Sequence, residues 1–303
     1  MKTKEIKLKI KSVSNIKKIT KTMEMVSVSK MRRAVDKALS SRSYSHYALE
    51  LLVNLSRDKN TEHPLMITPA KAENKELLII VTSNKGLCGG YHTNLFKALN
   101  LYIKKEENKN REFKAVTIGK YGEKICKKLN IPMFASFITF SEHSDINQTK
   151  ELSDLVAEEF KKGEYASVKI LYTEFLKSTT YKPVLRELFP LSVETVKNVV
   201  EDISENEGVV IDEKSLVDYQ FEPDLNIILE SILPGLVDIV VYQTLAEAYA
   251  SEHSARMFAM KNAGDSASTI LDELTLSYNH ARQDGITKEL FEIVAGAEAL
   301  NTN

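Results

Sequence analysis

The sequence predicts an α/β domain inserted between two terminal helices, which pair with each other as a long antiparallel coiled coil. Two observations lead to this fold class. Both ends of the 303-residue chain carry long helical patterns, and its middle alternates short apolar runs with helical segments. Such alternation is typical of a mostly parallel sheet with helices on its faces. We expect a helix over 1–65, an α/β domain over 75–195 and a helix over 210–303 that pairs with the first.

The N-terminal segment is expected to be helical because residues 1–63 contain neither glycine nor proline. Apolar residues recur there at steps of three and four, which predicts one face packed on the C-terminal helix. This stripe comprises Ile6, Ile10, Val13, Ile16, Ile19, Met23 and Val26. Residues 1–42 also hold thirteen Lys and Arg against three acids, so the other faces are basic. A basic surface could face solvent, an acidic partner or nucleic acid. No aromatic residues are interleaved with the basic ones, which argues against nucleic acid.

The middle of the chain has the pattern of β–α–β units in a Rossmann-like domain. ELLIIVTS, over 76–83, is apolar for most of its length, which is typical of a strand buried on both faces. A glycine-rich turn and a helical pattern follow it, and the alternation continues from there. The expected strands are 76–83, 113–119, 134–140, 167–175 and 184–191, and the expected helices are 93–107, 120–129 and 147–162.

The glycine-rich turn, SNKGLCGG, invites a phosphate-binding interpretation, because backbone N–H groups at a helix N-terminus can hold an anion. Its G-x-x-G-G spacing matches neither nucleotide-binding glycine motif, so we favour a structural turn that needs positive φ. A nucleophilic Cys88 would need a base such as His92, and the sequence shows no third group to orient that base. The six histidines have no metal-ligand spacing. We therefore predict no catalytic, cofactor-binding or metal-binding residue.

The composition is that of a soluble, folded protein kept in a reducing compartment. The chain is 43% hydrophobic and 27% charged, with a net charge of −1. Its two cysteines, Cys88 and Cys126, provide no disulfide framework. The charged N-terminus is not that of a signal peptide, and no apolar run approaches the roughly 20 residues that cross a bilayer. We expect no direct insertion into a bilayer.

An acidic connector and a very long helix complete the chain. Residues 201–224 hold nine acids and one lysine. Pro234-Gly235 should kink or restart the helix that follows. From Leu236 to Leu300 the pattern predicts a rod on the order of 95 Å long, which needs a partner along its length. Its seam, with a repeat of about 3.5 residues, comprises Ala263, Ala267, Ile270, Leu274, Ser277 and Ala281.

The last turns of this helix, LFEIVAGAEAL, are apolar nearly all round. A helix end that is apolar on every side must be enclosed, and a single partner helix shields only one side. We therefore expect a structure outside the helix pair to surround this tip.

Three separated stretches resemble sequences of one known family. IKKITKTMEMVSVSKMRRA, TSNKGLCGGYHTNLFK and ARMFAMKNAGDSASTILDELTLSYNHARQDGITKELFEIVAGAEAL are similar to the gamma subunit of the F-type ATP synthase, bacterial type. The resemblance covers essentially the whole chain. It implies a central rotor shaft that couples ion flow through a membrane ring to ATP synthesis or hydrolysis by rotation. The chain departs from the family at Asn84-Lys85, where an Asp-Arg pair is common.

The resemblance also implies partner contacts, with no catalytic role and no cofactor for this chain itself. Contacts with the beta subunit or an apolar sleeve are implied for Met23, Glu252, Arg256, Arg282, Gln283, Thr287, Leu290, Ile293, Val294 and Leu300. Contacts with the membrane ring or the epsilon subunit are implied for Tyr219 and Glu222. Without the resemblance, Arg282 would be a plain surface arginine, and Glu252 and Arg256 could pair with each other.

The implied partners are three alpha and three beta subunits, the epsilon and delta subunits, and the c-ring. The implied location is the cytoplasmic face of the bacterial inner membrane, where the chain is peripheral, and no nucleic acid is implied. Two other classes stay open from the residues alone. A nucleotide-binding α/β enzyme with helical oligomerisation arms would bind a nucleotide by itself. A coiled-coil scaffold or nucleic-acid protein would bind nucleic acid with a steep salt dependence.

Overall fold

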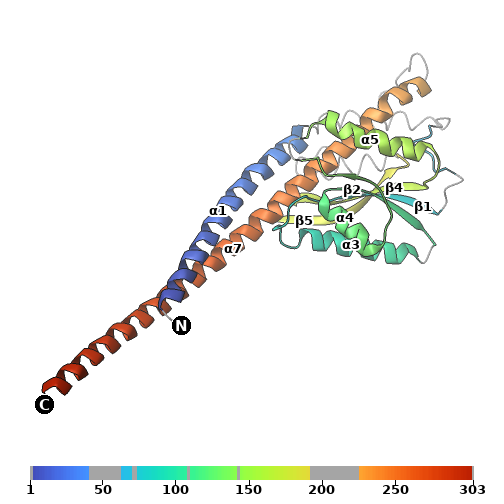
Figure 1. The fold of residues 1–303 in the computed structure, drawn as a ribbon. Helices are drawn as coiled ribbons and strands as arrows, with labels where there is room; N and C mark the ends of the chain where they lie inside the picture. Colours follow the sequence, from blue (N-terminus) through green and yellow to red (C-terminus); the bar gives the residue numbers. More distant parts are fainter. Residues whose placement is uncertain are drawn as a thin grey trace. The chain divides into compact units, whose positions relative to one another are not determined.

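The structure, a computed structural model, describes residues 3–40, 63–69, 74–107, 110–141, 144–191 and 225–301. Figure 1 shows a sheet with helices on its faces, together with two long terminal helices, α1 (Thr3–Ser40) and α7 (Leu225–Asn301). The predicted fold class, an α/β domain between two paired helices, is therefore confirmed.

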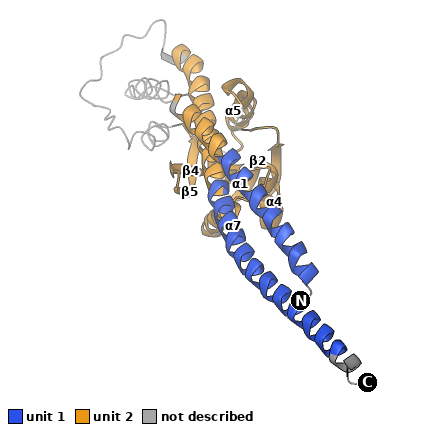
Figure 2. Ribbon diagram, turned by 90° about the vertical axis from the view of Figure 1, so that its left-hand side faces the viewer, with its two compact units in different colours: residues 1–27, 256–303 blue, residues 28–255 orange. Residues whose placement is uncertain are grey.

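The chain divides into two compact units, one of residues 1–27 with 256–303 and one of residues 28–255 (Figure 2). Each of the two long helices contributes to both units. The predicted division into 1–65, 75–195 and 210–303 follows secondary structure instead, and it remains a proposal.

A five-stranded sheet forms the centre of the unit of residues 28–255. Its strands are β1 (Lys75–Val81), β2 (Glu112–Ile118), β3 (Met133–Phe137), β4 (Ser167–Lys177) and β5 (Thr180–Phe189), in the order β3-β2-β1-β4-β5. The first four strands are parallel, because a helix intervenes before each of β2, β3 and β4. β5 follows β4 directly and pairs with it antiparallel, so the strand expected at 184–191 begins earlier, at Thr180.

Both faces of the sheet are buried. Along β1, Leu77, Ile79 and Val81 belong to one apolar cluster, whereas Leu78 and Ile80 belong to another. Each cluster marks one face, since successive side chains of a strand point to opposite sides. Helices α3 (Tyr91–Glu107) and α4 (Lys120–Leu129) complete the second cluster, and α5 (Ile146–Lys161) and α7 complete the first. The continuous apolar run of β1 reflects this double burial, as predicted.

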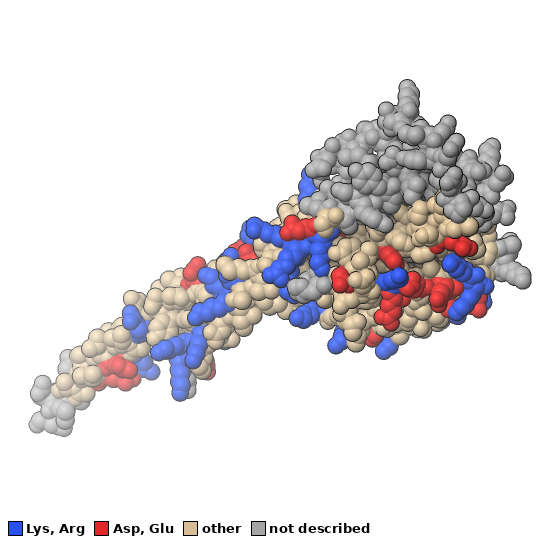
Figure 3. Space-filling view, turned by 90° about the horizontal axis from the view of Figure 1, so that it is seen from above, with Lys and Arg blue, Asp and Glu red and all other residues tan. Residues whose placement is uncertain are grey.

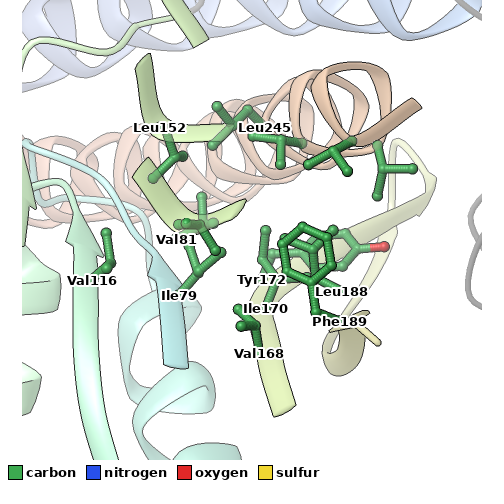
Figure 4. Packing of buried hydrophobic residues seen from close by; sticks show 14 of the residues in the cluster. Ile79, Val81, Val116, Leu152, Val168, Ile170, Tyr172, Leu188, Phe189 and Leu245 are labelled. Atoms are coloured by element: carbon green, nitrogen blue, oxygen red, sulfur yellow. The ribbon is translucent and has the colours of Figure 1, made fainter. Parts of the chain in front are cut away.

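In this unit, α7 packs on the same face of the sheet as α5. Figure 4 shows Leu245 of α7 and Leu152 of α5 over Val81 of β1 and Leu188 of β5. Of the kink or restart expected at Pro234-Gly235, the restart is wrong, because α7 is continuous through Pro234. Proline removes a backbone hydrogen bond from a helix. Here, burial of the flanking turns compensates, because Leu229, Leu233 and Leu236 are at most 3% exposed.

One carboxylate on this stretch of α7, that of Asp238, is poorly solvated. Its Oδ1 atom is buried and has no hydrogen-bond partner. Burial raises the pKa of the Asp238 carboxyl above its usual value of 3.8, and the charge of Asp154 adds to this, whereas Ser153 and Lys150 lower it. The folded chain thus holds this proton more tightly than the unfolded chain does. The resulting stabilisation is complete below about pH 3.8 and is lost as the pH rises through the folded-state pKa.

Replacing Asp238 with asparagine should therefore stabilise this unit at neutral pH, because an amide fills the same space without ionising. The gain should shrink as the pH falls towards about 4, where the native carboxyl becomes protonated as well. Thermal unfolding of both proteins across this pH range measures the difference. A gain that grows with acidity would contradict the argument.

In the other unit, α1 and α7 lie side by side (Figure 2). Their facing residues recur about every 3.5 positions, the spacing of a coiled coil. The buried or half-buried seam positions are Ile6, Ile10, Val13, Thr20 and Ser27 on α1, and Met260, Gly264, Ala267, Leu271, Leu274, Tyr278 and Ala281 on α7.

The seam predicted from the sequence is partly wrong. Ile16, Ile19 and Val26 of α1 are exposed, as are Ile270 and Ser277 of α7. The seam instead passes through small residues, and a Cβ atom on Gly264 would lie 3.4 Å from Thr20 Oγ1. Small side chains let two helices approach closely, so they occupy the seam although larger apolar residues lie one position away.

Candidate functional site

The glycine-rich turn between β1 and α3 is packed against its neighbours. Leu87 and Gly89 have φ values of 61° and 57°, so the turn needs positive φ, as expected. A Cβ atom on Gly86 would lie 2.6 Å from Tyr121 Oη, at the start of α4. Because a side chain from α4 already fills the space beside this glycine, the turn has a structural role and is not an open cradle for a phosphate.

Asn84, at a position where the resemblance to the gamma family implies aspartate, ties this turn to the neighbouring loops. Its Nδ2 donates to Ile138 O at 2.8 Å, and its Oδ1 accepts from Lys120 N at 3.1 Å. An amide can donate and accept at once, whereas a carboxylate can only accept. The departure from the family pattern therefore has a local structural explanation.

Three chemically active side chains meet beneath the turn. Ser83 Oγ lies 2.9 Å from His92 Nε2, and Cys88 Sγ lies 3.4 Å from His92 Nδ1. Ser83 is the third group that the sequence alone did not reveal, since nothing in its spacing indicates that it faces His92. Cys88 and Ser83 are both 3% exposed.

The place where α/β folds of this kind bind nucleotides is occupied by α7. Such ligands bind at the carboxyl ends of the strands, where the strand order reverses, which here is between β1 and β4. Tyr91 Oη, at the start of α3, donates to Ala248 O of α7 at 3.3 Å. Beyond β4, Ser254 Oγ of α7 donates to Ser178 O. Among the residues that the structure describes, no group of three His, Cys, Asp or Glu side chains could hold a metal ion.

A second apolar stripe on α1 faces away from the seam. It follows steps of three, four and three through Ile16, Ile19, Met23 and Val26. Ile16, Ile19 and Val26 are 50%, 59% and 49% exposed, and Met23 is half-buried. Burying an exposed aliphatic side chain contributes about 1.5–3 kcal/mol. This stripe is therefore a candidate contact surface, distinct from the contact with α7.

The tip of α7 is exposed on all sides. Every described side chain from Arg282 to Ala297 is exposed, which includes the predicted contacts Gln283 and Thr287. Its large apolar side chains, from 50% to 70% exposed, are Ile286, Leu290, Phe291, Ile293 and Val294. Figure 2 shows why: α7 continues beyond the N-terminus of α1, so this helix no longer has α1 beside it. As expected, α1 does not cover the tip of α7 in this unit.

The other predicted contact residues are less accessible or lie outside the described residues. Glu252 and Arg256 are only 7% and 6% exposed, so their side chains are largely covered by the chain itself. Tyr219 and Glu222 lie outside the described residues, as does the side chain of Leu300. Contacts of all these residues with partner subunits remain predictions.

One helix, within Ile227–Ala297 of α7, is long and apolar enough to cross a membrane by length and composition alone. This differs from the expectation that no segment approaches such a length. The relevant window is 50% buried within the fold, and the core helix of a soluble protein passes the same test, so this is weak evidence for a membrane span.

The chain matches a protein-family model described as ATP synthase over residues 2–300. It is 36% identical over 299 residues to the ATP synthase gamma chain of Janthinobacterium sp. (strain Marseille), covering 98% of this chain and 99% of that one. It is 39% identical over 302 residues to the ATP synthase gamma chain of Verminephrobacter eiseniae, with 98% and 97% covered. Its fold is similar to that of a chain in the Euglena gracilis mitochondrial ATP synthase (OSCP/F1/c-ring, rotational state 3), with a TM-score of 0.67, 20% identity and coverage of 98% and 94%.

Proposed function

This chain belongs to the ATP synthase gamma family, in which it is a non-catalytic subunit and the central rotor shaft, and we propose how its parts perform that task. Ion flow through a membrane ring turns the shaft. The turning shaft presents different sides to the catalytic subunits and forces each of their sites through open, loose and tight states in turn. ATP hydrolysis drives the reverse rotation.

The tip of α7 turns inside an apolar sleeve formed by three alpha and three beta subunits. The observation that carries this proposal is the fully exposed tip, whose large side chains around Leu290, Phe291 and Ile293 are mostly apolar. Apolar contacts are non-directional, so they hold the tip at any angle of rotation. Hydrogen bonds or ion pairs would instead favour particular angles. Arg282, Gln283 and Thr287 lie at the base of the tip and contact one beta subunit.

The second apolar stripe of α1 and the basic surface around it face an acidic part of the beta subunit. The exposed lysines of α1 include Lys7, Lys11 and Lys18. On the face seen in Figure 3, Lys and Arg are more frequent than Asp and Glu over the paired helices. A surface of this charge favours an acidic partner and guides its approach.

The shaft also contacts the c-ring and the epsilon subunit around Tyr219 and Glu222, in a complex that also holds the delta subunit. The chain is thereby peripheral to the membrane, at the cytoplasmic face of the bacterial inner membrane. This placement is supported by the family's membership in a membrane-bound enzyme.

Rotation itself is the direct test. The chain would be assembled with alpha and beta subunits, the alpha–beta hexamer fixed to a surface, and a visible probe attached to the α/β domain of this chain. ATP should turn the probe in one direction, and a non-hydrolysable analogue should not. Steady ATP hydrolysis with a stationary probe would contradict the proposal.

Replacing Met23 with lysine should impair coupling more than ATPase turnover. The new ammonium group would stand beside the acidic surface of the beta subunit and form an ion pair that must break at every step, at a cost of about 1–3 kcal/mol. Proton pumping per ATP hydrolysed, measured in membrane vesicles, should fall several-fold. Lysine in place of Met25, which is 62% exposed and lies on another side of α1, is the matched control and should leave coupling unchanged. If both substitutions lowered proton pumping per ATP equally, the proposed contact of Met23 with the beta subunit would be wrong.

A further inference from the structure

The cluster of Ser83, Cys88 and His92 lies outside the surfaces to which the rotor function has been assigned. It joins the end of β1, the glycine-rich turn and the first turn of α3. These residues are close in space, and packing of the helix pair does not explain why a serine, a cysteine and a histidine meet here.

Hydrogen-bond accounting determines where the protons lie. The hydroxyl of Ser83 has one proton, and Ser83 Oγ donates it to Lys85 O at 2.7 Å. At its contact of 2.9 Å with His92 Nε2 the serine oxygen must therefore accept, so Nε2 carries a proton. His92 Nδ1 is then the acceptor that faces Cys88 Sγ at 3.4 Å. The arrangement is a thiol, a base and a group that orients the base.

Aromatic side chains hold the imidazole in this orientation. The ring centroid of Tyr121 lies 3.8 Å from that of His92, and the ring centroid of Tyr91 lies 5.2 Å from it, with the two planes at 76°. Since the ring is fixed on two sides as well as at both nitrogens, Nδ1 stays directed at the sulfur atom.

We propose that Cys88 is an activated thiol, with His92 as its base and Ser83 as the positioning residue, and that its reactants are small hydroperoxides. Their size follows from access. Cys88 is 3% exposed, while Leu87 beside it is 65% exposed, so little more than the turn itself separates the sulfur from solvent. A hydroperoxide is small enough to pass such a barrier.

The reaction balances without any group beyond the peroxide. The thiol proton passes to His92 Nδ1, and the thiolate attacks one oxygen of the hydroperoxide. An S–O bond forms and the O–O bond breaks. The departing alkoxide, or hydroxide from hydrogen peroxide, takes the proton back from Nδ1 and leaves as alcohol or water. Sulfur loses two electrons, the peroxide gains them, and Cys88 becomes a sulfenic acid.

Oxidation would change the packing next to the shaft. The apolar cluster that contains Cys88 also includes Ala255 of α7. A sulfenic acid adds an oxygen atom beside this cluster. Its O–H can donate to His92 Nδ1, so the enlarged side chain, rather than an unpaired polar atom, would alter the packing.

The second cysteine of the chain is an internal control. Cys126 is fully buried, and burial, together with the charge of Glu123, raises the pKa of its thiol to about 11. The intact chain would be treated with hydrogen peroxide at neutral pH, and the peroxide then removed. The chain would be unfolded in the presence of dimedone, which traps the sulfenic acid, and each cysteine peptide quantified by mass spectrometry. Cys88 should react at least about tenfold faster than Cys126. Equal rates in the folded chain would overturn the proposal.

Two variants distinguish activation of the Cys88 thiol by His92 from simple solvent access to its sulfur atom. His92→Asn removes the base and should lower the Cys88 rate about tenfold or more, and Ser83→Ala should lower it less, because only the orientation is lost. The pH profile of the wild-type chain gives an independent reading. Iodoacetamide labelling of Cys88 should stay fast well below about pH 8.5, the ordinary pKa of cysteine, and His92→Asn should restore a rise near that pH. An unchanged rate and pH profile in His92→Asn would overturn the role of His92.

Discussion

Removing residues 290–303 should leave the α/β domain folded and weaken assembly with alpha and beta subunits by at least about a hundredfold. The domain should survive because the tip belongs to the other compact unit. The loss in affinity follows from burial. Leu290, Phe291, Ile293 and Val294 are 55–70% exposed in the free chain, and complete burial of each contributes about 1.5–3 kcal/mol. Part of this total is offset by the entropy lost on association, so at least about 3 kcal/mol should remain.

Titration of the labelled chain with the alpha–beta hexamer measures the affinity, and ATP synthesis in membrane vesicles measures the coupling. A truncated chain that sustains synthesis at the full rate would show that the sleeve does not depend on the tip. Paired substitutions keep the helix length constant. Leu290→Glu with Ile293→Glu should behave like the truncation, since each substitution replaces a large apolar side chain with a carboxylate that must lose its hydration against an apolar surface. Glu289→Gln with Glu292→Gln alters only exposed polar positions and should leave assembly intact.

Local patterns predict this fold wherever neighbouring residues decide the structure. β1 is recognisable because both of its faces are buried, so the whole run is apolar. The helix expected at 120–129 has those limits in the structure. The exposed tip follows from its composition as well, because one helix partner cannot cover a cylinder that is apolar on all sides.

Contacts between distant segments are different, because no local pattern encodes the register. The seam between the long helices runs through Thr20 and Gly264, although Ile19 and Ile270 are more apolar. Small residues occupy the seam because they let the backbones of α1 and α7 approach closely. How closely two helices approach depends on both of them, so the sequence of one helix does not show it. In the same way, Cys88 and His92 are visible as neighbours in sequence. Ser83 joins them only because the turn folds back on the end of β1.

The buried charges around Glu76 are a further case that the sequence could not reveal. Glu76 is 0% exposed although it lies at the start of a strand. Its carboxylate pairs with Arg111, accepts a hydrogen bond from Tyr102 Oη, and lies 3.3 Å from Lys169 Nζ, a residue 93 positions away. Lys169 Nζ also donates to Tyr102 Oη at 2.7 Å, so the members of the network satisfy one another. Burial raises the pKa of the Tyr102 phenol, which keeps it protonated as a donor.

Replacing Glu76 with alanine should lower the free energy of unfolding of this unit by about 3–5 kcal/mol, because two buried or half-buried cations would lose their common partner. Glutamine should cost less, since its amide oxygen still accepts from Tyr102 while the charge is lost. Urea unfolding is followed by hydrogen exchange of the β1 amides for Glu76 and of the α7 amides around residue 292 for the control. Each unit is thus read separately, and urea does not screen the ion pairs. Glu292→Ala is the matched control in the exposed pair of Lys288 and Glu292, 4.0 Å apart, and should change stability by less than about 0.5 kcal/mol. Similar small effects at both sites would mean that the buried network contributes no more than a surface pair, and the account of Glu76 would fail.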